Sequence, residues 1–109
     1  MYKLAIALML TTSMAMADND FSFTVMDVFQ ISRDKVDVLI TGRIETGSVS
    51  VGDAICLHAA DGNTPLTVSA ISFQGRTDTA QAGDIGGIGV KDIERDDVRK
   101  GDTLSATCD

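Results

Sequence analysis

The sequence has no tryptophan, a single proline, a single histidine and few aromatic residues of any kind. Beyond residue 17 the aromatic side chains are all phenylalanines, so surfaces for stacking nucleic-acid bases or sugars are scarce. Only 9 lysines and arginines stand against 16 aspartates and glutamates, which gives a formal net charge of −7. Phosphate backbones and anionic membranes repel such a chain, so we expect it not to bind nucleic acid.

No Gly-x-x-x-x-Gly-Lys-Ser/Thr sequence occurs. The chain therefore lacks the loop with which GTPases bind phosphate, and we expect neither GTP binding nor any other cofactor. The apolar run Leu4–Leu10 is too short to span a bilayer.

This run instead belongs to a pattern typical of a secretory signal peptide at residues 1–17. Lys3 supplies a positive charge before Leu4–Leu10, and Ala15–Ala17 has the small-x-small form that signal peptidase cleaves. Cleavage would leave about 92 residues without a membrane span, and it would move the net charge from −7 to −8 because Lys3 is lost. The sequence thus predicts a periplasmic or secreted protein. The alternative is a short amphipathic or buried helix.

The two cysteines, Cys56 and Cys108, allow a single intramolecular pairing. In an oxidising compartment an even number of cysteines indicates a disulfide bond. The bond would close a loop of about fifty residues and stabilise the fold by about 4 kcal/mol on the chain-entropy model. The alternative is two free thiols.

Short apolar runs between Gly- and Asp-marked turns predict an all-β domain. Gly-Asp recurs before three of these runs, and we expect tight turns there in which Gly takes a positive φ and Asp bonds nearby backbone N–H groups. We expect an irregularity at Met26–Asp27 and a charged loop or helical turn at Asp92–Arg99. The predicted strands are 21–25, 28–31, 36–44, 49–51, 54–58, 66–73, 85–90 and 103–107.

Several blocks resemble the second domain of elongation factor Tu, the translation-factor β-barrel. They follow the order and nearly the spacing of that family from Phe21 to Leu104. The blocks are Asp27-Val28-Phe29-x-Ile31, Thr41-Gly42-Arg43-Ile44-Glu45-x-Gly47, Val51-Gly52-Asp53, Phe73, Ala82-Gly83-Asp84-x-Gly86 and Val98-x-x-Gly101-Asp102-x-Leu104.

The resemblance implies that residues 18–109 form a closed six-stranded Greek-key barrel. Two regions depart from the family pattern. Ser32–Lys35 replaces a Gly-Arg-Gly corner, and Ala70–Ser72 lacks the family's acidic residue before the barrel phenylalanine. In elongation factor Tu these regions help to hold the aminoacylated tRNA end, so the departures argue against that role here.

Three other groups of residues are of types found in catalytic or binding sites, but each has a simpler structural explanation. His58 lies two residues from Cys56, but catalysis by a Cys-His pair needs a free thiolate, so we expect a surface histidine. The acidic stretch Asp92–Asp97 lacks the ligand spacing of a calcium loop, and we expect a solvated loop. The glycines of 86–89 either admit a ligand or mark tight curvature, and curvature is the commoner use.

The sequence thus favours a non-enzymatic exported binding module that acts through contact with an unidentified protein. The first alternative is a translation-related domain that contacts tRNA or the ribosome without GTPase activity. A weaker alternative is a carrier of a small ligand or metal. The predicted contact loops comprise Ser32, Arg33, Asp34 and Lys35 in one segment and Gln74, Gly75 and Arg76 in another.

Overall fold

The computed structural model describes residues 20–33, 36–73 and 78–108. This part of the chain is all-β, as predicted, and its single helical turn is a 3-10 helix, η2 (Arg95–Asp97). The strands are β1 (Ser22–Arg33), β2 (Val36–Thr46), β3 (Ser48–Ser50), β4 (Ala54–Ala59), β5 (Gly62–Thr67), β6 (Ala70–Ser72), β7 (Thr79–Gln81), β8 (Ile85–Val90) and β9 (Thr103–Ser105).

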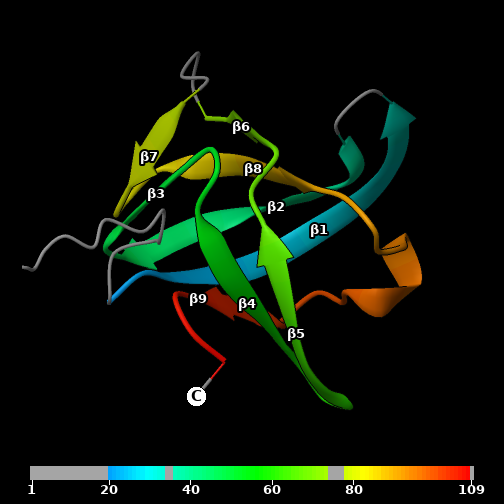
Figure 1. The fold of residues 1–109 in the computed structure, drawn as a ribbon. Helices are drawn as coiled ribbons and strands as arrows, with labels where there is room; N and C mark the ends of the chain where they lie inside the picture. The colour runs from blue at the N-terminus through cyan, green and yellow to red at the C-terminus, as the bar shows by residue number, and fades with distance from the viewer. Residues whose placement is uncertain (1–19, 34–35, 74–77, 109) are drawn as a thin grey trace, which may run out of the picture.

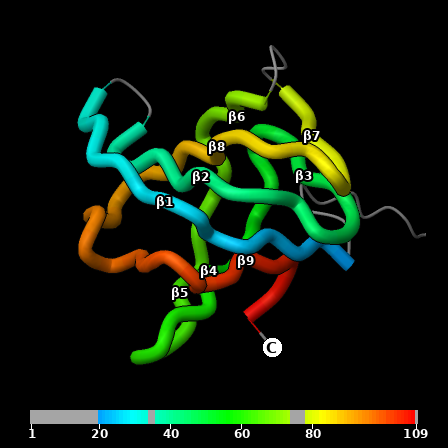
Figure 2. The backbone as a smooth tube through the Cα atoms, turned by 180° about the vertical axis from the view of Figure 1, so that it is seen from behind, coloured from blue at the N-terminus to red at the C-terminus, as the bar shows by residue number. Residues whose placement is uncertain are grey.

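Seven of these strands form one sheet in the order β5-β4-β9-β1-β2-β8-β6, and neighbouring strands are antiparallel (Figure 1). The short strands β3 and β7 pair separately. The sheet is strongly curved, so that β4 and β5 lie across from β1 and β2 when the backbone is viewed from behind (Figure 2). Its two end strands, β5 and β6, are consecutive in the chain and are separated only by Val68 and Ser69.

The long hairpin of β1 and β2 is the centre of the sheet. Its register shifts between Val25 and Asp27, which confirms the predicted irregularity at Met26–Asp27. Because this shift reverses the inside–outside alternation, Val25 and Val28 are both buried although they are three positions apart along the strand.

The prediction of one continuous strand at 66–73 was wrong. The chain leaves β5 after Thr67 and enters β6 at Ala70. Between them the Val68 N–H donates to the Asp53 carbonyl at 3.0 Å, and the Ser69 N–H donates to the Gly89 carbonyl at 2.8 Å. The two backbone groups therefore bond to opposite ends of the sheet order, and this change of partner divides the strand.

Two glycines bring the strands of the core close together. Gly42 on β2 pairs with Gly86 on β8. A Cβ atom at Gly42 would lie 2.8 Å from the Phe23 ring, and one at Gly86 would lie 2.7 Å from the Phe73 ring. The rings of Phe23 and Phe73 meet edge to face, with centroids 6.4 Å apart. The absence of two side chains thus makes room for two aromatic rings.

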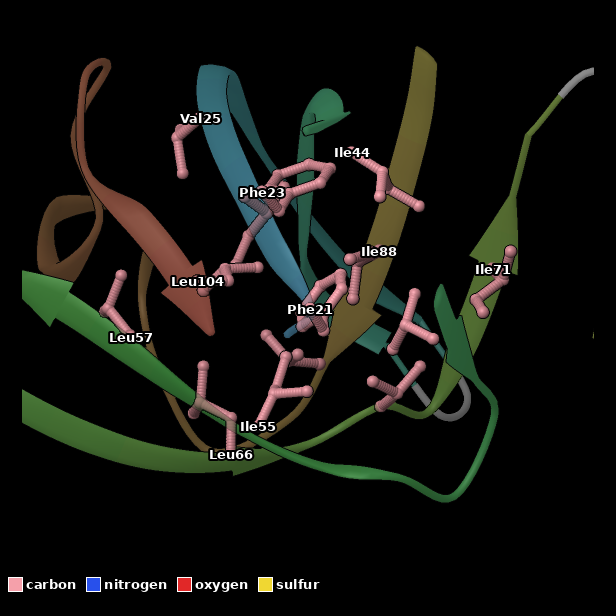
Figure 3. Close-up of a cluster of buried hydrophobic side chains, with 14 of the residues drawn as sticks. Phe21, Phe23, Val25, Ile44, Ile55, Leu57, Leu66, Ile71, Ile88 and Leu104 are labelled. Atoms are coloured by element: carbon pink, nitrogen blue, oxygen red, sulfur yellow. The ribbon is translucent and has the colours of Figure 1, made fainter. Parts of the chain in front are cut away.

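The rest of the core surrounds these rings and draws on most strands (Figure 3). The largest fully buried side chains are Phe21, Phe23, Phe73, Ile40, Ile44, Leu57, Ile88, Leu104, Val25, Val38, Val49 and Val68. Among the described residues no polar or charged residue is buried. The interior formed by the described residues is therefore a packed apolar core.

The three Gly-Asp turns have nearly the same geometry, which confirms their prediction. The φ angles are 95° at Gly52, 94° at Gly83 and 94° at Gly101. In each turn an aspartate Oδ2 accepts the backbone N–H three residues earlier, at 2.8–2.9 Å, and the aspartate N–H donates back to the carbonyl of that residue. The aspartates are Asp53, Asp84 and Asp102.

The predicted signal peptide at residues 1–17 lies outside the described residues. No helix within the described ranges is long and apolar enough to cross a membrane.

Candidate functional site

The predicted contact loops are only partly described. Ser32 and Arg33 are exposed at the end of β1, and Ser32 has a positive φ of 52°. Asp34, Lys35, Gln74, Gly75 and Arg76 lie outside the described residues. What the structure does show is the surface on which the first of these loops stands.

That surface carries exposed apolar side chains. On β1, Phe29 is 46% exposed and Ile31 is 37% exposed. They lie on one face of the strand, opposite buried Val28, because successive strand residues alternate between faces. Phe29 pairs with half-buried Leu39 on β2. We call Phe29, Ile31 and Leu39 the hairpin face.

The register continues this surface across the sheet. Leu39 pairs with Gly89 on β8, and Gly89 pairs with Ala70 on β6. A Cβ atom at Gly89 would lie 2.7 Å from a Val36 methyl carbon and 3.3 Å from the Ala70 Cβ. The region Ser32–Lys35 ends directly before Val36, and Ala70 begins the segment Ala70–Ser72. Gly89 is therefore covered by Val36, the residue that follows the first of these segments, and by Ala70, the first residue of the second.

The same contacts decide between the two interpretations of the glycines at 86–89. Gly86 lies against the Phe73 ring, Gly87 lies under the Leu39 side chain, and Gly89 is covered as described above. Since the protein's own side chains fill the space over all three, these glycines allow close packing of strands rather than the approach of a ligand.

An acidic hollow of about 490 Å³ adjoins the hairpin. Gln30 and Ser32 of β1 line it, and so does the segment around η2. The Gln30 Oε1 atom accepts the Arg95 N–H at 3.1 Å, and its Nε2 donates to the Asp37 carbonyl at 3.0 Å. The described residues of the lining contribute four carboxylates and no basic side chain. These carboxylates belong to Asp37, Asp92, Glu94 and Asp97.

Two of these carboxylates have structural partners. Asp37 Oδ2 accepts the Asp92 N–H at 2.8 Å, and Asp97 Oδ2 accepts the Glu94 N–H at 2.9 Å. Within the described part of the chain no group of three or more His, Cys, Asp or Glu residues is arranged to hold a metal ion. The predicted solvated loop is confirmed, since every acidic side chain of Asp92–Asp97 is exposed.

A second hollow, of about 660 Å³, lies beside β5. Its lining mixes polar and apolar residues, and it includes Pro65, Ile93 and Lys91. Proline at position 65 removes a backbone donor from a strand that ends the sheet, which makes this strand a poor template for an added strand.

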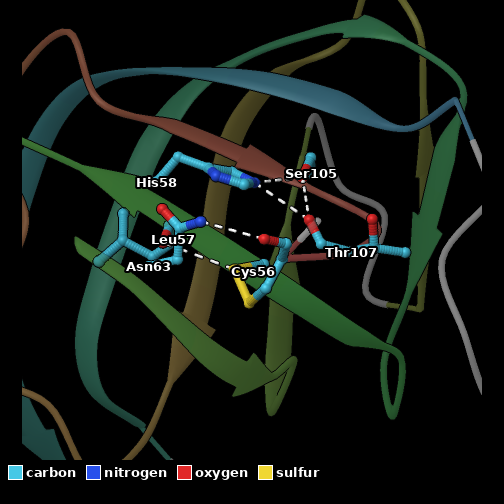
Figure 4. The surroundings of a disulfide bond; sticks show 7 residues. Cys56, Leu57, His58, Asn63, Ser105 and Thr107 are labelled. Carbon is cyan, nitrogen blue, oxygen red and sulfur yellow. Dashed lines mark hydrogen bonds between the residues drawn. A yellow bond between two sulfur atoms is a disulfide. The ribbon is translucent and has the colours of Figure 1, made fainter.

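The structure contains the predicted disulfide bond between Cys56 and Cys108, with an S–S distance of 1.96 Å (Figure 4). Ile55 and Leu57 belong to the core, so Cys56 points to the outer face of β4. Cys56 is nevertheless only 1% exposed, whereas Cys108 is exposed. The last described residues therefore cover this part of the outer face.

His58 takes part in fastening this segment, a contact that the sequence did not reveal. Its Nε2 lies 2.6 Å from the Ser105 Oγ and 3.1 Å from the Thr107 carbonyl oxygen (Figure 4). The Ser105 hydroxyl donates to the same carbonyl at 2.7 Å. A carbonyl oxygen only accepts, so the arrangement requires a proton on Nε2. In this tautomer His58 is a donor that helps to hold the segment in place.

Residues 37–105 match the family model of elongation factor Tu domain 2. The chain belongs to this family. The resemblance found in the sequence is thereby confirmed, and the domain 2 fold explains the antiparallel order of the strands.

Two structures of one translation factor are among the solved structures that share this fold. The apo form of translation elongation factor SelB from Methanococcus maripaludis matches 86% of the chain with a TM-score of 0.71 and 22% identity. The complex of the same factor with the GTP analogue GppNHp matches 90% of the chain with a TM-score of 0.71 and 21% identity. The domain 2 homologue spans about a fifth of the length of these SelB chains.

Proposed function

We propose that this elongation factor Tu domain 2 homologue is an exported, non-enzymatic binding module that acts through contact with another protein. The observation that carries the proposal is the disulfide bond between Cys56 and Cys108. Such bonds persist in secreted and periplasmic proteins and are rare in the reducing cytosol, where translation factors work. The signal-peptide pattern at residues 1–17 supports the same compartment.

The proposal takes the curved sheet to be a closed six-stranded barrel. The strands β5 and β6 occupy opposite ends of the sheet order yet are joined by Val68 and Ser69. If they are counted as one bent strand, the order becomes a ring of six strands. Two hydrogen bonds of the link between β5 and β6 support this closure. The Val68 N–H bonds to Asp53, directly before β4, and the Ser69 N–H bonds to Gly89 on β8, near the other end of the sheet order.

A binding role fits the chemistry of the surface better than an enzymatic role. Catalysis by a serine or cysteine needs a nucleophile beside a base. Here Cys56 is held in the disulfide, and the Ser105 hydroxyl donates to the Thr107 carbonyl. The side chains left available to a ligand are those of the hairpin face and the charged loops, which suit recognition of another protein. No observation favours the carrier of a small ligand or metal.

The experiment is in vivo crosslinking in the producing organism, followed by purification of the tagged full chain from separate envelope, medium and cytosolic fractions. We expect the protein and a specific crosslinked partner in the envelope or the medium. Recovery of the chain in the cytosol, crosslinked to ribosomal or tRNA-binding components, would overturn the proposal.

Family membership favours one second candidate, a translation-related domain that contacts tRNA or the ribosome without GTPase activity. It requires residues 1–17 not to direct export. The net charge of −7 counts against it, because contacts with phosphate depend on lysine and arginine. The same fractionation separates the two candidates, since this one places the reduced chain with ribosomes.

A further inference from the structure

We propose that small thiols open the Cys56–Cys108 bond while the domain stays folded, and that they attach at Cys108. This inference goes beyond the proposed function and does not depend on the identity of a protein partner. It follows from the unequal exposure of the two cysteines and from the contacts that hold the end of the described chain beside β4.

The two halves of the disulfide bond differ in access. Cys56 lies in β4, and the register places Ser105 of β9 on one side of it and Pro65 of β5 on the other. Cys56 is enclosed by its neighbours and is only 1% exposed. Cys108 follows the last strand and is exposed. Because a thiolate must reach the sulfur that it attacks, Cys108 is the half of the bond that is open to a small thiol.

Backbone contacts hold this end of the chain independently of the sulfur atoms (Figure 4). The Asn63 amide donates to the Cys108 carbonyl at 3.0 Å, and His58 Nε2 lies 3.1 Å from the Thr107 carbonyl oxygen. His58 and Asn63 are themselves paired across β4 and β5. Neither contact uses a sulfur atom, so both persist when the bond opens. They keep Cys108 close to Cys56, whose Cα atom lies 5.1 Å away in the closed form.

The exchange balances in atoms and electrons. A thiolate attacks the Cys108 sulfur, and a new S–S bond joins the small thiol to Cys108 while the Cys56–Cys108 bond breaks. The electron pair of the broken bond leaves with the Cys56 sulfur, which takes up the proton that the small thiol gave to solvent. The small thiol is thus oxidised and Cys56 is reduced. The Leu57 carbonyl oxygen, 3.6 Å from the Cys56 sulfur, is placed to accept the new S–H.

The reverse step closes the bond again. The Cys56 thiolate attacks the Cys108 sulfur and displaces the small thiol. This step is intramolecular, and the contacts of Asn63 and His58 keep the reacting groups together, so it is favoured over a second attack from solution. The adduct on Cys108 is therefore reversible.

The competing route is exchange after unfolding. In the unfolded chain both cysteines are accessible, so a thiol attaches to either of them. The rate then follows the unfolded fraction, which for a small domain rises at least about fivefold per molar urea. Attack on the folded domain instead depends on the thiol concentration and hardly on urea below the unfolding transition.

The test adds 2-mercaptoethanol to the oxidised protein at several urea concentrations below the unfolding transition. The reaction is quenched with acid, and peptic peptides are analysed by mass spectrometry. We expect the adduct on the peptide that contains Cys108 and a free thiol on the peptide that contains Cys56. The initial rate of adduct formation should change less than about twofold per molar urea.

Two matched variants test the contacts at the chain end. Asn63→Ala removes the hydrogen bond to the Cys108 carbonyl, so the equilibrium fraction of adduct at a fixed thiol concentration should rise about twofold. Ser50→Ala removes an exposed hydroxyl contact of 3.0 Å with Thr79, between β3 and β7. It should leave the adduct fraction unchanged.

Three results would overturn the inference: an adduct mainly on Cys56 or equally on both cysteines, a rate that rises with urea in step with unfolding, or the same adduct fraction in both variants. None of them bears on the proposed contact with another protein, which the crosslinking experiment tests separately.

Discussion

Removal of the disulfide bond should lower the free energy of unfolding by about 4 kcal/mol at 25 °C. Cys56 and Cys108 are separated by 52 residues, and closing a loop of that length restricts the unfolded chain by about 14 cal/mol/K on the chain-entropy model. The effect acts chiefly on the unfolded state, because other contacts hold the same segment in the folded state. The Asn63 amide donates to the Cys108 carbonyl at 3.0 Å, and His58 contacts the Thr107 carbonyl.

The assay is urea unfolding, followed by circular dichroism, of the oxidised protein and of the double variant Cys56→Ala, Cys108→Ala. The slope of the unfolding free energy against urea should also rise in the variant, because its unfolded chain is less compact. Reductant should bring the native protein close to the variant and leave the variant unchanged. A loss of about 4 kcal/mol would be a large share of the roughly 5–15 kcal/mol by which such domains are stable. A difference below about 1 kcal/mol between the two proteins would refute the reasoning.

Four further substitutions test the fold by the same urea assay. Phe73→Ala should cost about 3–5 kcal/mol, since it removes one ring of the central aromatic pair; a smaller loss would mean that the core collapses around the gap. Gly42→Ala should cost about 3 kcal/mol, because the new methyl group meets the Thr24 carbonyl and the Phe23 ring. Gly52→Ala should cost about 1 kcal/mol, because the space around Gly52 is open but its φ of 95° is unfavourable for alanine. Equal costs would contradict the packing argument. Asp102→Ala should cost about 1 kcal/mol through the lost bond, and no change would show that the turn does not need it.

The features that the sequence predicted are those determined by neighbouring residues. Gly-Asp pairs impose a positive φ and a side-chain bond within four residues, so all three turns could be located. The irregularity at Met26–Asp27 was visible as a break in the alternation of apolar residues. The cysteine pair could be assigned because two cysteines have one pairing.

The features that could not be predicted from the sequence depend on contacts between residues far apart in the chain. The division of 66–73 follows from bonds of Val68 and Ser69 to two different parts of the sheet, and no local pattern marks that seam. His58 and Ser105 are 47 residues apart. Their contact could have been sought by pairing the strand of Cys56 with the strand before Cys108, since Cys56 lies opposite Ser105 in the sheet.

The measurement that tests the account most directly is the intact mass of the protein, purified from fractions of its own host and analysed with and without reductant and alkylation. If the protein is exported, the chain in the envelope or the medium lacks residues 1–17, is two hydrogens lighter than its reduced form, and is alkylated only after reduction. A full-length chain in the cytosol with both cysteines open to alkylation would contradict it and would make the translation-related role the better explanation.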